Sequence, residues 1–176
     1  MPTTVFELTR DYGLVILAST AVAFEYFLTP LVFVSPIRRK VFTKEFLTKN
    51  FGDVHRREIG GEVPPGGYPD HGDGRYSQQL PYKQWLELSS AYRVHLNFTE
   101  QIGIILPFTL IAGIRYPKAA AYLGFGYVVS RIVYGVGYLF KPSARNFGSV
   151  GISVITVALG ALAALTGFKI FAKQLV

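Results

Sequence analysis

Residues 101–140 read QIGIILPFTLIAGIRYPKAAAYLGFGYVVSRIVYGVGYLF, and this stretch decides the fold. It holds two apolar runs; the first ends at Ile114 and the second begins at Ala119. Each run belongs to a segment of about 20 residues or more, the length that crosses a bilayer as a helix. Pro117 lies in the short connection and cannot continue the first helix. The stretch therefore predicts two antiparallel membrane helices joined by a tight turn.

The same apolar pattern extends toward both ends of the chain and gives four segments. We expect helices over about Tyr12–Ile37, Leu86–Ile114, Ala119–Phe140 and Asn146–Phe168. The third and fourth segments are also joined by a short connection, and short connections place consecutive helices antiparallel. The sequence therefore predicts an all-α, integral membrane four-helix bundle with up-down-up-down topology.

The composition agrees with a chain that lies mostly in lipid. Hydrophobic residues make up 50% of the 176 residues and charged residues only 16%, against about 25% charged residues in ordinary soluble proteins. Mean hydropathy is +0.31, and the length suits a single domain, residues 1–176. Intrinsic disorder is excluded, and the absence of cysteine excludes disulfide scaffolds and thiolate metal sites.

The formal net charge of +7 would suggest a nucleic acid partner in a soluble protein, but membrane orientation explains it here, and we expect no nucleic acid. One side of the predicted bundle carries Arg38, Arg39, Lys40, Lys44, Lys49, Arg56, Arg57, Arg75, Lys83, Lys141 and Arg145. The other side carries only Arg10, Arg115, Lys118, Lys169 and Lys173. The long loop, residues 41–85, is therefore expected on the cytosolic or matrix side, with both termini opposite.

This loop is dense in glycine and proline, which forbids long regular elements. A short amphipathic helix from about Thr43 to Phe51 fits the spacing of its apolar residues. The potential metal ligands of the loop are His55, Asp70, His71 and Asp73. Their spacing matches neither HxxxH nor CxxC, so we interpret them as part of a solvated turn region and expect no metal site.

Charged residues inside the apolar segments are the candidates for function. Glu25 lies in the first segment, Arg93 and Glu100 in the second, and Arg131 in the third. A charge at bilayer depth costs about 2.5–3.5 kcal/mol on insertion scales, so such residues face a bundle interior or a water-filled cavity. Two interpretations are open: a ligand site, or ion pairs Arg93–Glu100 and Arg131–Glu25 that neutralise each other between helices.

Helical spacing gathers polar residues into one pocket near the loop side of the membrane. One face of the second segment carries Arg93, Asn97 and Glu100. One face of the third segment carries Arg131, Tyr134 and Tyr138. Arg145 follows at the membrane edge. Arginine holds carboxylates in a two-pronged geometry, and a glutamate takes an ammonium. The pocket therefore suits a small zwitterion with more than one carboxylate.

Four stretches carry a family resemblance. The sequence RVHLNFTE occupies residues 93–100, with Pro107 later in the same helix, and RIVYGVGY occupies residues 131–138. PSAR follows at residues 142–145, and VSPIRRK ends the first segment at residues 34–40. These stretches resemble motifs of the MAPEG family, membrane-associated proteins of eicosanoid and glutathione metabolism. In the same order, the family motifs are an R-x-x-x-N-x-x-E helix, an R-x-x-Y-x-x-G-Y helix, a P-S-x-R turn and the basic end of the first helix. R-x-H-x-N-x-x-E is most similar to microsomal glutathione transferase type 3.

The resemblance implies four transmembrane helices assembled as a homotrimer, with glutathione as co-substrate between neighbouring subunits. Carried over by position, it implies that glutathione binds to Arg38, Arg93, Asn97, Glu100, Tyr134 and Tyr138. Arg131, on the face of Tyr134, joins this predicted binding set. Arg145 matches the arginine that stabilises the glutathione thiolate; a cation beside a thiol lowers its pKa from about 8.5 and raises the reactive thiolate fraction.

The resemblance predicts a glutathione transferase or peroxidase of the endoplasmic reticulum or mitochondrial membrane. Its second substrate would be a lipophilic electrophile or lipid hydroperoxide that reaches the site through the membrane lipid. Gln101 stands where the leukotriene synthase branch has tyrosine, which argues against a dedicated leukotriene synthase. The loop is far longer than in the type 3 pattern and could be a lid or a docking surface. The alternative is a non-catalytic accessory subunit of a larger membrane complex, such as a respiratory complex, or a lipid-presenting relative. The loop aromatics would then form its docking element: Tyr68, Tyr76, Tyr82 and Trp85.

Overall fold

The computed structural model describes residues 10–173, which form helices and connecting loops with no β-strand among them. Within these residues, four helical stretches are long and apolar enough to cross a membrane: Tyr12–Val41, Tyr82–Arg115, Pro117–Phe140 and Arg145–Ala172. The prediction of an all-α fold with four long apolar segments is confirmed. The chain is a multi-pass integral membrane protein.

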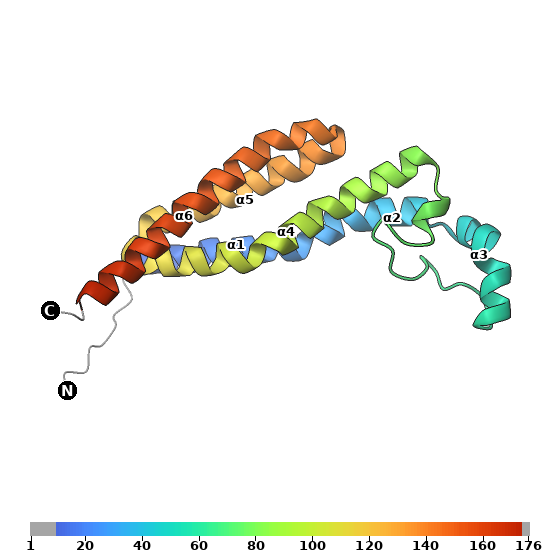
Figure 1. Ribbon diagram of the computed structural model, residues 1–176, viewed down its shortest axis with the longest axis horizontal. Coiled ribbons are helices and arrows are strands. Elements are labelled where there is room, and N and C mark those ends of the chain that lie inside the picture. The colour runs from blue at the N-terminus through green and yellow to red at the C-terminus, as the bar shows by residue number, and fades with distance from the viewer. Residues whose placement is uncertain (1–9, 174–176) are drawn as a thin grey trace.

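The helices run up, down, up and down along one long axis (Figure 1). In chain order the spanning elements are α1 (Tyr12–Thr29) continued by α2 (Ser35–Val41), then α4 (Tyr82–Arg115), α5 (Pro117–Phe140) and α6 (Arg145–Lys173). The ends of α1 and α6 that lead to the two termini lie at one end of the molecule. The long loop with α3 (Lys44–Glu58) lies at the other end.

The turn between α4 and α5 is as short as the sequence predicts. Only Tyr116 separates the two helices, and its N–H donates to the Ala112 carbonyl at 2.9 Å. Pro117 is the first residue of α5. At this position a backbone N–H would make no hydrogen bond within the helix, so proline, which lacks the N–H, costs nothing there. The proline therefore ends one helix and starts the next.

The first membrane helix contains Pro30 and Pro36 and widens by a π-helical turn between them. Residues Pro30–Val34 form the π-helical segment η1, in which the Ser35 N–H bonds to the Pro30 carbonyl. The Ser35 hydroxyl donates to the same oxygen at 3.1 Å. Proline cannot donate to the regular ladder, and a π-turn re-satisfies the freed backbone groups. The helix thereby continues through α2, which carries Arg38 at the loop end of the bundle.

Small residues bring α6 close to α5. A β-carbon on Gly148 would overlap the backbone of Tyr134, and one on Gly151 would lie 2.5 Å from the Ser130 hydroxyl. Membrane helices use such residues to gain contact area, because lipid offers no hydrophobic drive for helix association. The close packing of the last two helices fixes where Tyr134 lies.

The bundle has a buried core and an apolar outer surface. Val15, Val22, Phe98 and Ile105 are fully buried between α1 and α4 in a core that continues into α5 and α6. Large apolar side chains also project outward from the spanning helices, among them Phe27, Val129, Val157 and Phe168. This outer surface is suited to lipid or to a neighbouring subunit.

The long loop is folded, and its helix is longer than the sequence analysis allowed. Helix α3 covers Lys44–Glu58, whereas we expected a helix only to about Phe51. Thr43 caps its start by accepting a hydrogen bond from the Phe46 N–H at 3.2 Å. The dense glycine and proline begin only at Gly60, so composition averaged over the whole loop hid a helix-compatible stretch.

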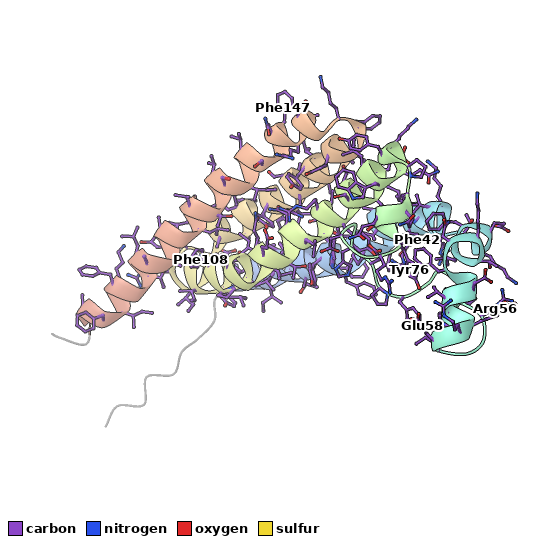
Figure 2. The ribbon with its side chains drawn as sticks, turned by 45° about the vertical axis from the view of Figure 1, so that its right-hand side comes forward. Phe42, Arg56, Glu58, Tyr76, Phe108 and Phe147 are labelled. Carbon is purple, nitrogen blue, oxygen red and sulfur yellow. The ribbon has the colours of Figure 1, made fainter. Side chains whose placement is uncertain are left out.

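A second apolar core attaches this loop to the bundle. Phe42 and Leu47 are buried together with Tyr76 and Leu80 of the loop and Leu88 of α4. Figure 2 shows Phe42 and Tyr76 near each other, with their ring centroids 5.7 Å apart. The loop is therefore a compact unit at the end of the bundle.

Candidate functional site

Arg131 is the centre of the polar network inside the bundle. Its side chain comes from α5 and is 2% exposed. One terminal nitrogen donates to the Asn97 Oδ1 atom at 2.7 Å and the other to the Val94 carbonyl at 2.8 Å, both on α4. The guanidinium also lies 4.2 Å from the centroid of the Phe98 ring. Arg131 therefore joins α5 to α4 and fixes the side chain of Asn97.

Two residues that sequence reasoning did not assign to the site extend this network. The Gln101 amide nitrogen donates to Asn97 Oδ1 at 3.4 Å, and the Tyr127 hydroxyl donates to Gln101 Oε1 at 2.9 Å. Tyr127 lies four residues before Arg131, on the same helical face, and Gln101 lies four residues after Asn97. That spacing is the signal that could have revealed both residues.

A second polar cluster lies where α5 turns into α6. The Arg145 guanidinium donates to the Tyr138 hydroxyl at 2.9 Å and lies 4.9 Å from the centroid of the same ring. The Tyr138 and Tyr134 rings are 5.6 Å apart and edge-to-face. Gly137 permits this turn, because a β-carbon there would lie 2.9 Å from the Ala144 carbonyl. The fold thus aligns Arg145 with the tyrosine face.

The two clusters meet at Tyr134. The Arg131 guanidinium lies 5.0 Å from the Tyr134 ring, and Tyr134 in turn contacts Tyr138. Asn97, Arg131, Tyr134, Tyr138 and Arg145 therefore form one continuous line of hydrogen bonds, cation–π contacts and ring contacts across α4, α5 and the start of α6. The structure brings these five predicted residues together.

Arg93 and Glu100 lie on the outer face of α4 and are exposed. Counted back from Arg115, the roughly 20 residues that cross about 30 Å of hydrocarbon end near His95. Arg93 is therefore at the loop-side surface, and Glu100 lies about 10 Å further along the helix toward the bilayer centre. Among residues 10–173, no ion pair joins Arg93 to Glu100 or Arg131 to Glu25. In the described part of this single chain, neither pair is in direct ion-pair contact.

Arg38 bonds to the long loop. Its guanidinium donates to the carbonyls of Gly66 at 2.9 Å, Tyr68 at 2.6 Å and Asp70 at 3.1 Å. It also donates to the Tyr92 hydroxyl at 3.2 Å. In this arrangement both terminal nitrogens of Arg38 are occupied by the protein, and the loop covers the end of α2.

Two of the four loop residues considered as metal ligands, His55 and Asp70, bond to the backbone of the loop. The Asp70 carboxylate accepts from the N–H groups of Gly72, Gly74 and Ser77 at 2.9–3.1 Å. Burial by itself would raise the pKa of the Asp70 carboxyl, but these hydrogen bonds outweigh it and hold the pKa below its usual value. In the part of the chain that the structure describes, no three His, Asp or Glu residues are grouped to hold a metal ion.

This geometry can be compared with known families. The sequence model of the MAPEG family matches residues 15–166, which is most of the chain. The chain belongs to the MAPEG family. The resemblance seen in the four motifs is thereby confirmed, and every candidate site residue from Arg38 to Arg145 lies within the matched region.

Membership in the MAPEG family carries a general expectation of chemistry. Its members are membrane proteins that use glutathione, and their substrates are lipophilic. The match is to the family as a whole, and does not distinguish the type 3 branch from others. In this MAPEG protein the line of contacts from Asn97 to Arg145 lies wholly within the matched region.

Proposed function

We propose that this MAPEG protein is a membrane-bound glutathione transferase or peroxidase, of the type 3 branch. The observation that carries the proposal is the Arg145–Tyr138 contact at 2.9 Å. Arg145 is also the first residue of the long helix α6, whose N-terminus favours negative charge. A cation and a helix N-terminus together suit a thiolate.

Glutathione would be held by the polar groups on α4 and α5. Asn97 and the two tyrosines would supply hydrogen bonds, Glu100 would face the ammonium, and Arg93 would face a carboxylate, joined by Arg38 if its bonds to the loop open. Arg131 has its terminal nitrogens on Asn97 and Val94, so its role in the set is to position Asn97. The proposed binding residues are Arg38, Arg93, Asn97, Glu100, Arg131, Tyr134 and Tyr138, with Arg145 as the catalytic residue.

The chemistry requires a deprotonated sulfur. In a transfer reaction the thiolate attacks an electrophilic carbon and forms a thioether, while either a leaving group departs with its bonding electron pair or the π bond of an activated alkene breaks and takes up a proton. In a peroxidase reaction it attacks the terminal oxygen of a lipid hydroperoxide, which releases the lipid alcohol and leaves a sulfenic acid. A second glutathione converts that sulfenic acid to the disulfide and water. Both reactions need the thiolate that Arg145 would stabilise.

Exposed charge on α4 supports an oligomer with the site between subunits. Glu100 would contact hydrocarbon in an isolated chain, which costs about 2.5–3.5 kcal/mol or more for a charged group. A neighbouring subunit that covers Arg93 and Glu100 removes that cost. A homotrimer, as in other family members, would place glutathione at the subunit boundary, entering from the cytosol or matrix, while the lipophilic substrate arrives laterally from lipid.

A glutathione titration tests this function. Purified protein is titrated with glutathione while thiolate absorbance is followed in the ultraviolet. We expect a saturable thiolate signal that Arg145→Ala abolishes. Lys141→Ala, which removes an exposed cation four residues earlier, should retain the signal. A full signal in the Arg145 variant would exclude the proposed role of Arg145.

One observation favours the second candidate, a non-catalytic accessory subunit of a larger membrane complex. Arg38, a predicted glutathione ligand, is bonded to the loop, and the loop forms a packed unit suited to docking. In that case the protein would bind no glutathione at millimolar concentration. It would instead co-purify from mild detergent with other membrane subunits.

A further inference from the structure

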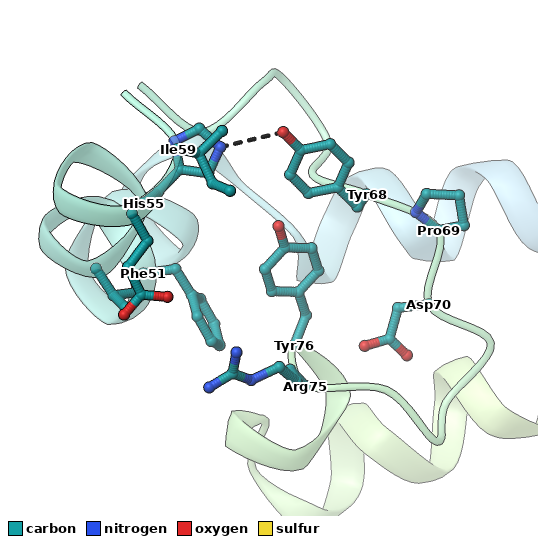
Figure 3. A pocket seen from close by; sticks show the side chains of 10 residues that line it. Phe51, His55, Ile59, Tyr68, Pro69, Asp70, Arg75 and Tyr76 are labelled. Atoms are coloured by element: carbon teal, nitrogen blue, oxygen red, sulfur yellow. Dashed lines mark hydrogen bonds between the residues drawn. The ribbon is translucent and has the colours of Figure 1, made fainter. Parts of the chain in front are cut away.

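We propose that the folded loop carries a second ligand site, for a small carboxylic acid with an apolar body. A cavity of about 300 Å³ lies between α3 and residues 68–76 (Figure 3). This volume is at the lower end of the range for small-molecule sites and equals that of about ten water molecules. None of the residues that line it belongs to the proposed glutathione set.

The walls of the cavity are mainly apolar. Phe51 and Tyr76 meet edge-to-face with ring centroids 4.7 Å apart, and Tyr68 forms the facing side (Figure 3). Val54 and Ile59 add aliphatic surface from α3 and the residue that follows it. Aromatic and aliphatic walls of this kind bind a ring or a branched chain, while a few polar groups fix its orientation.

Three charged side chains line the cavity, Glu58, Asp70 and Arg75, and the two carboxylates have partners in the protein. Glu58 is paired with Arg57 at 3.2 Å, and the carboxylate of Asp70 is turned to the loop backbone. Within residues 10–173, the Arg75 guanidinium makes no ion pair or side-chain hydrogen bond. Figure 3 shows Arg75 beside the Phe51 ring, away from His55 and Tyr68. The Arg75 guanidinium is exposed at the cavity, so its paired donors are open to the carboxylate of a ligand whose apolar body lies against the aromatic walls.

Hydrogen bonds fix the cavity in place. His55 contacts the Tyr68 hydroxyl at 3.1 Å through Nε2 and the Gly61 carbonyl at 3.2 Å through Nδ1. Arg38 holds the Tyr68 carbonyl at 2.6 Å. The two sides of the cavity are therefore connected to each other and to α2. A cavity held in this way loses little conformational freedom when a ligand binds.

The single tryptophan provides a local probe of binding. Trp85 donates its indole N–H to the Gly72 carbonyl at 2.7 Å, and Gly72 lies between the cavity residues Asp70 and Arg75. The test uses the full chain in nanodiscs of zwitterionic lipid, with 4-phenylbutyrate as the acid and 4-phenylbutyramide as its neutral match. We expect a saturable change in Trp85 fluorescence with the acid. The amide should bind at least about tenfold more weakly, because it lacks the charge that Arg75 recognises.

Variants decide whether Arg75 and the cavity are responsible. Arg75→Gln should weaken acid binding about tenfold and remove the difference between acid and amide. Lys49→Gln removes one positive charge from an exposed position on the opposite face of α3 and should bind the acid like the wild type. Val54→Phe should abolish binding by filling the cavity, with an unchanged Trp85 spectrum before ligand is added. Equal binding of acid and amide, or wild-type affinity in Arg75→Gln, would overturn the proposal.

This site stands apart from the proposed glutathione chemistry. Arg145→Ala should lose the thiolate signal and keep acid binding, whereas Arg75→Gln should do the reverse. A protein that binds no glutathione but retains the acid response would refute only the proposed function. A protein that activates glutathione and ignores the acid would refute only the loop site.

Discussion

Arg131 and Arg145 both serve the tyrosine face of α5, but their surroundings differ. Arg131 is 2% exposed and bonded to two groups on α4, whereas Arg145 is exposed and bonded to one tyrosine hydroxyl. Burial makes the bonds of Arg131 costly to remove, because the acceptors on α4 would be left without partners. Residue type alone does not distinguish Arg131 from Arg145, whereas their depth in the bundle does.

Replacing Arg131 should therefore affect stability before chemistry. Arg131→Gln loses at least one hydrogen bond from a charged donor, so we expect a loss of about 1.5–3 kcal/mol in stability. Thermal unfolding in detergent measures this loss. Arg145→Gln is the matched control and should melt near the wild-type temperature, because its guanidinium is exposed. Equal melting temperatures for all three proteins would show that the α4–α5 bonds of Arg131 do not stabilise the fold.

Asp70 makes the loop sensitive to acid. Its pKa is lowered in the folded protein, so its stabilising effect is complete above the ordinary aspartate pKa of about 3.9 and is lost as pH falls through the lower folded value. We expect the loop to loosen only at strongly acidic pH, seen as a change in Trp85 fluorescence. Asp70→Asn should destabilise the loop at neutral pH by about 1.5–3 kcal/mol, because the amide cannot replace every accepted bond.

The control for this experiment is the neighbouring carboxylate of Asp73, which is exposed. Asp73→Asn should leave the acid transition of the loop unchanged. If Asp70→Asn gave the wild-type transition, the three backbone bonds to Asp70 would not be what holds the turn together.

At the scale of elements, the contact between α5 and α6 depends on a missing side chain. Gly148→Ala places a methyl group into the backbone of Tyr134, so the helices must separate, at a cost of about 1–3 kcal/mol. Gly167→Ala in the same helix has no atom within 4 Å of the new carbon and should be neutral or slightly stabilising. Thermal unfolding of the two variants tests this, and similar melting temperatures would contradict the packing argument.

The spanning elements could be predicted from sequence because lipid imposes a simple rule. Each needs about 20 apolar residues, and Pro117 marks one turn between them. Helix α3 was predicted too short, since glycine and proline later in the loop concealed a helix-compatible stretch up to Glu58. The start of α3 could be predicted from the sequence, because threonine is a favourable N-cap residue and Thr43 takes that position.

Some features of the candidate site could likewise be predicted from the sequence, and others could not. Positions on one helical face, such as Arg131, Tyr134 and Tyr138, follow from periodicity, and the structure groups them. The bonds of Arg38 to loop carbonyls could not be predicted, because backbone acceptors leave no trace in residue type or spacing. The same is true of the cavity beside Arg75, which depends on how a glycine-rich loop folds back on α3.

At the scale of the whole molecule, the excess of cations at one end predicts how the protein sits in its membrane. The structure gathers the long loop and the α5–α6 turn at one end of the bundle, so their charges add. The chain has no cysteine, so a single introduced cysteine is the only site of thiol labelling and reports on which side of the membrane that residue lies. Thr48 of α3 and Ala119 at the start of α5 are exposed and lie at opposite ends of the bundle.

In sealed vesicles with the cytosolic or matrix face outward, a membrane-impermeant maleimide should label Thr48→Cys at once. Ala119→Cys should react only after detergent opens the vesicles. Labelling of both positions from one face would contradict the arrangement of four spans, because an odd number of crossings separates the two residues. The reverse order, with Ala119→Cys accessible first, would keep the four spans but invert the orientation, and would place the loop and the mouth of the proposed glutathione site on the opposite side of the membrane.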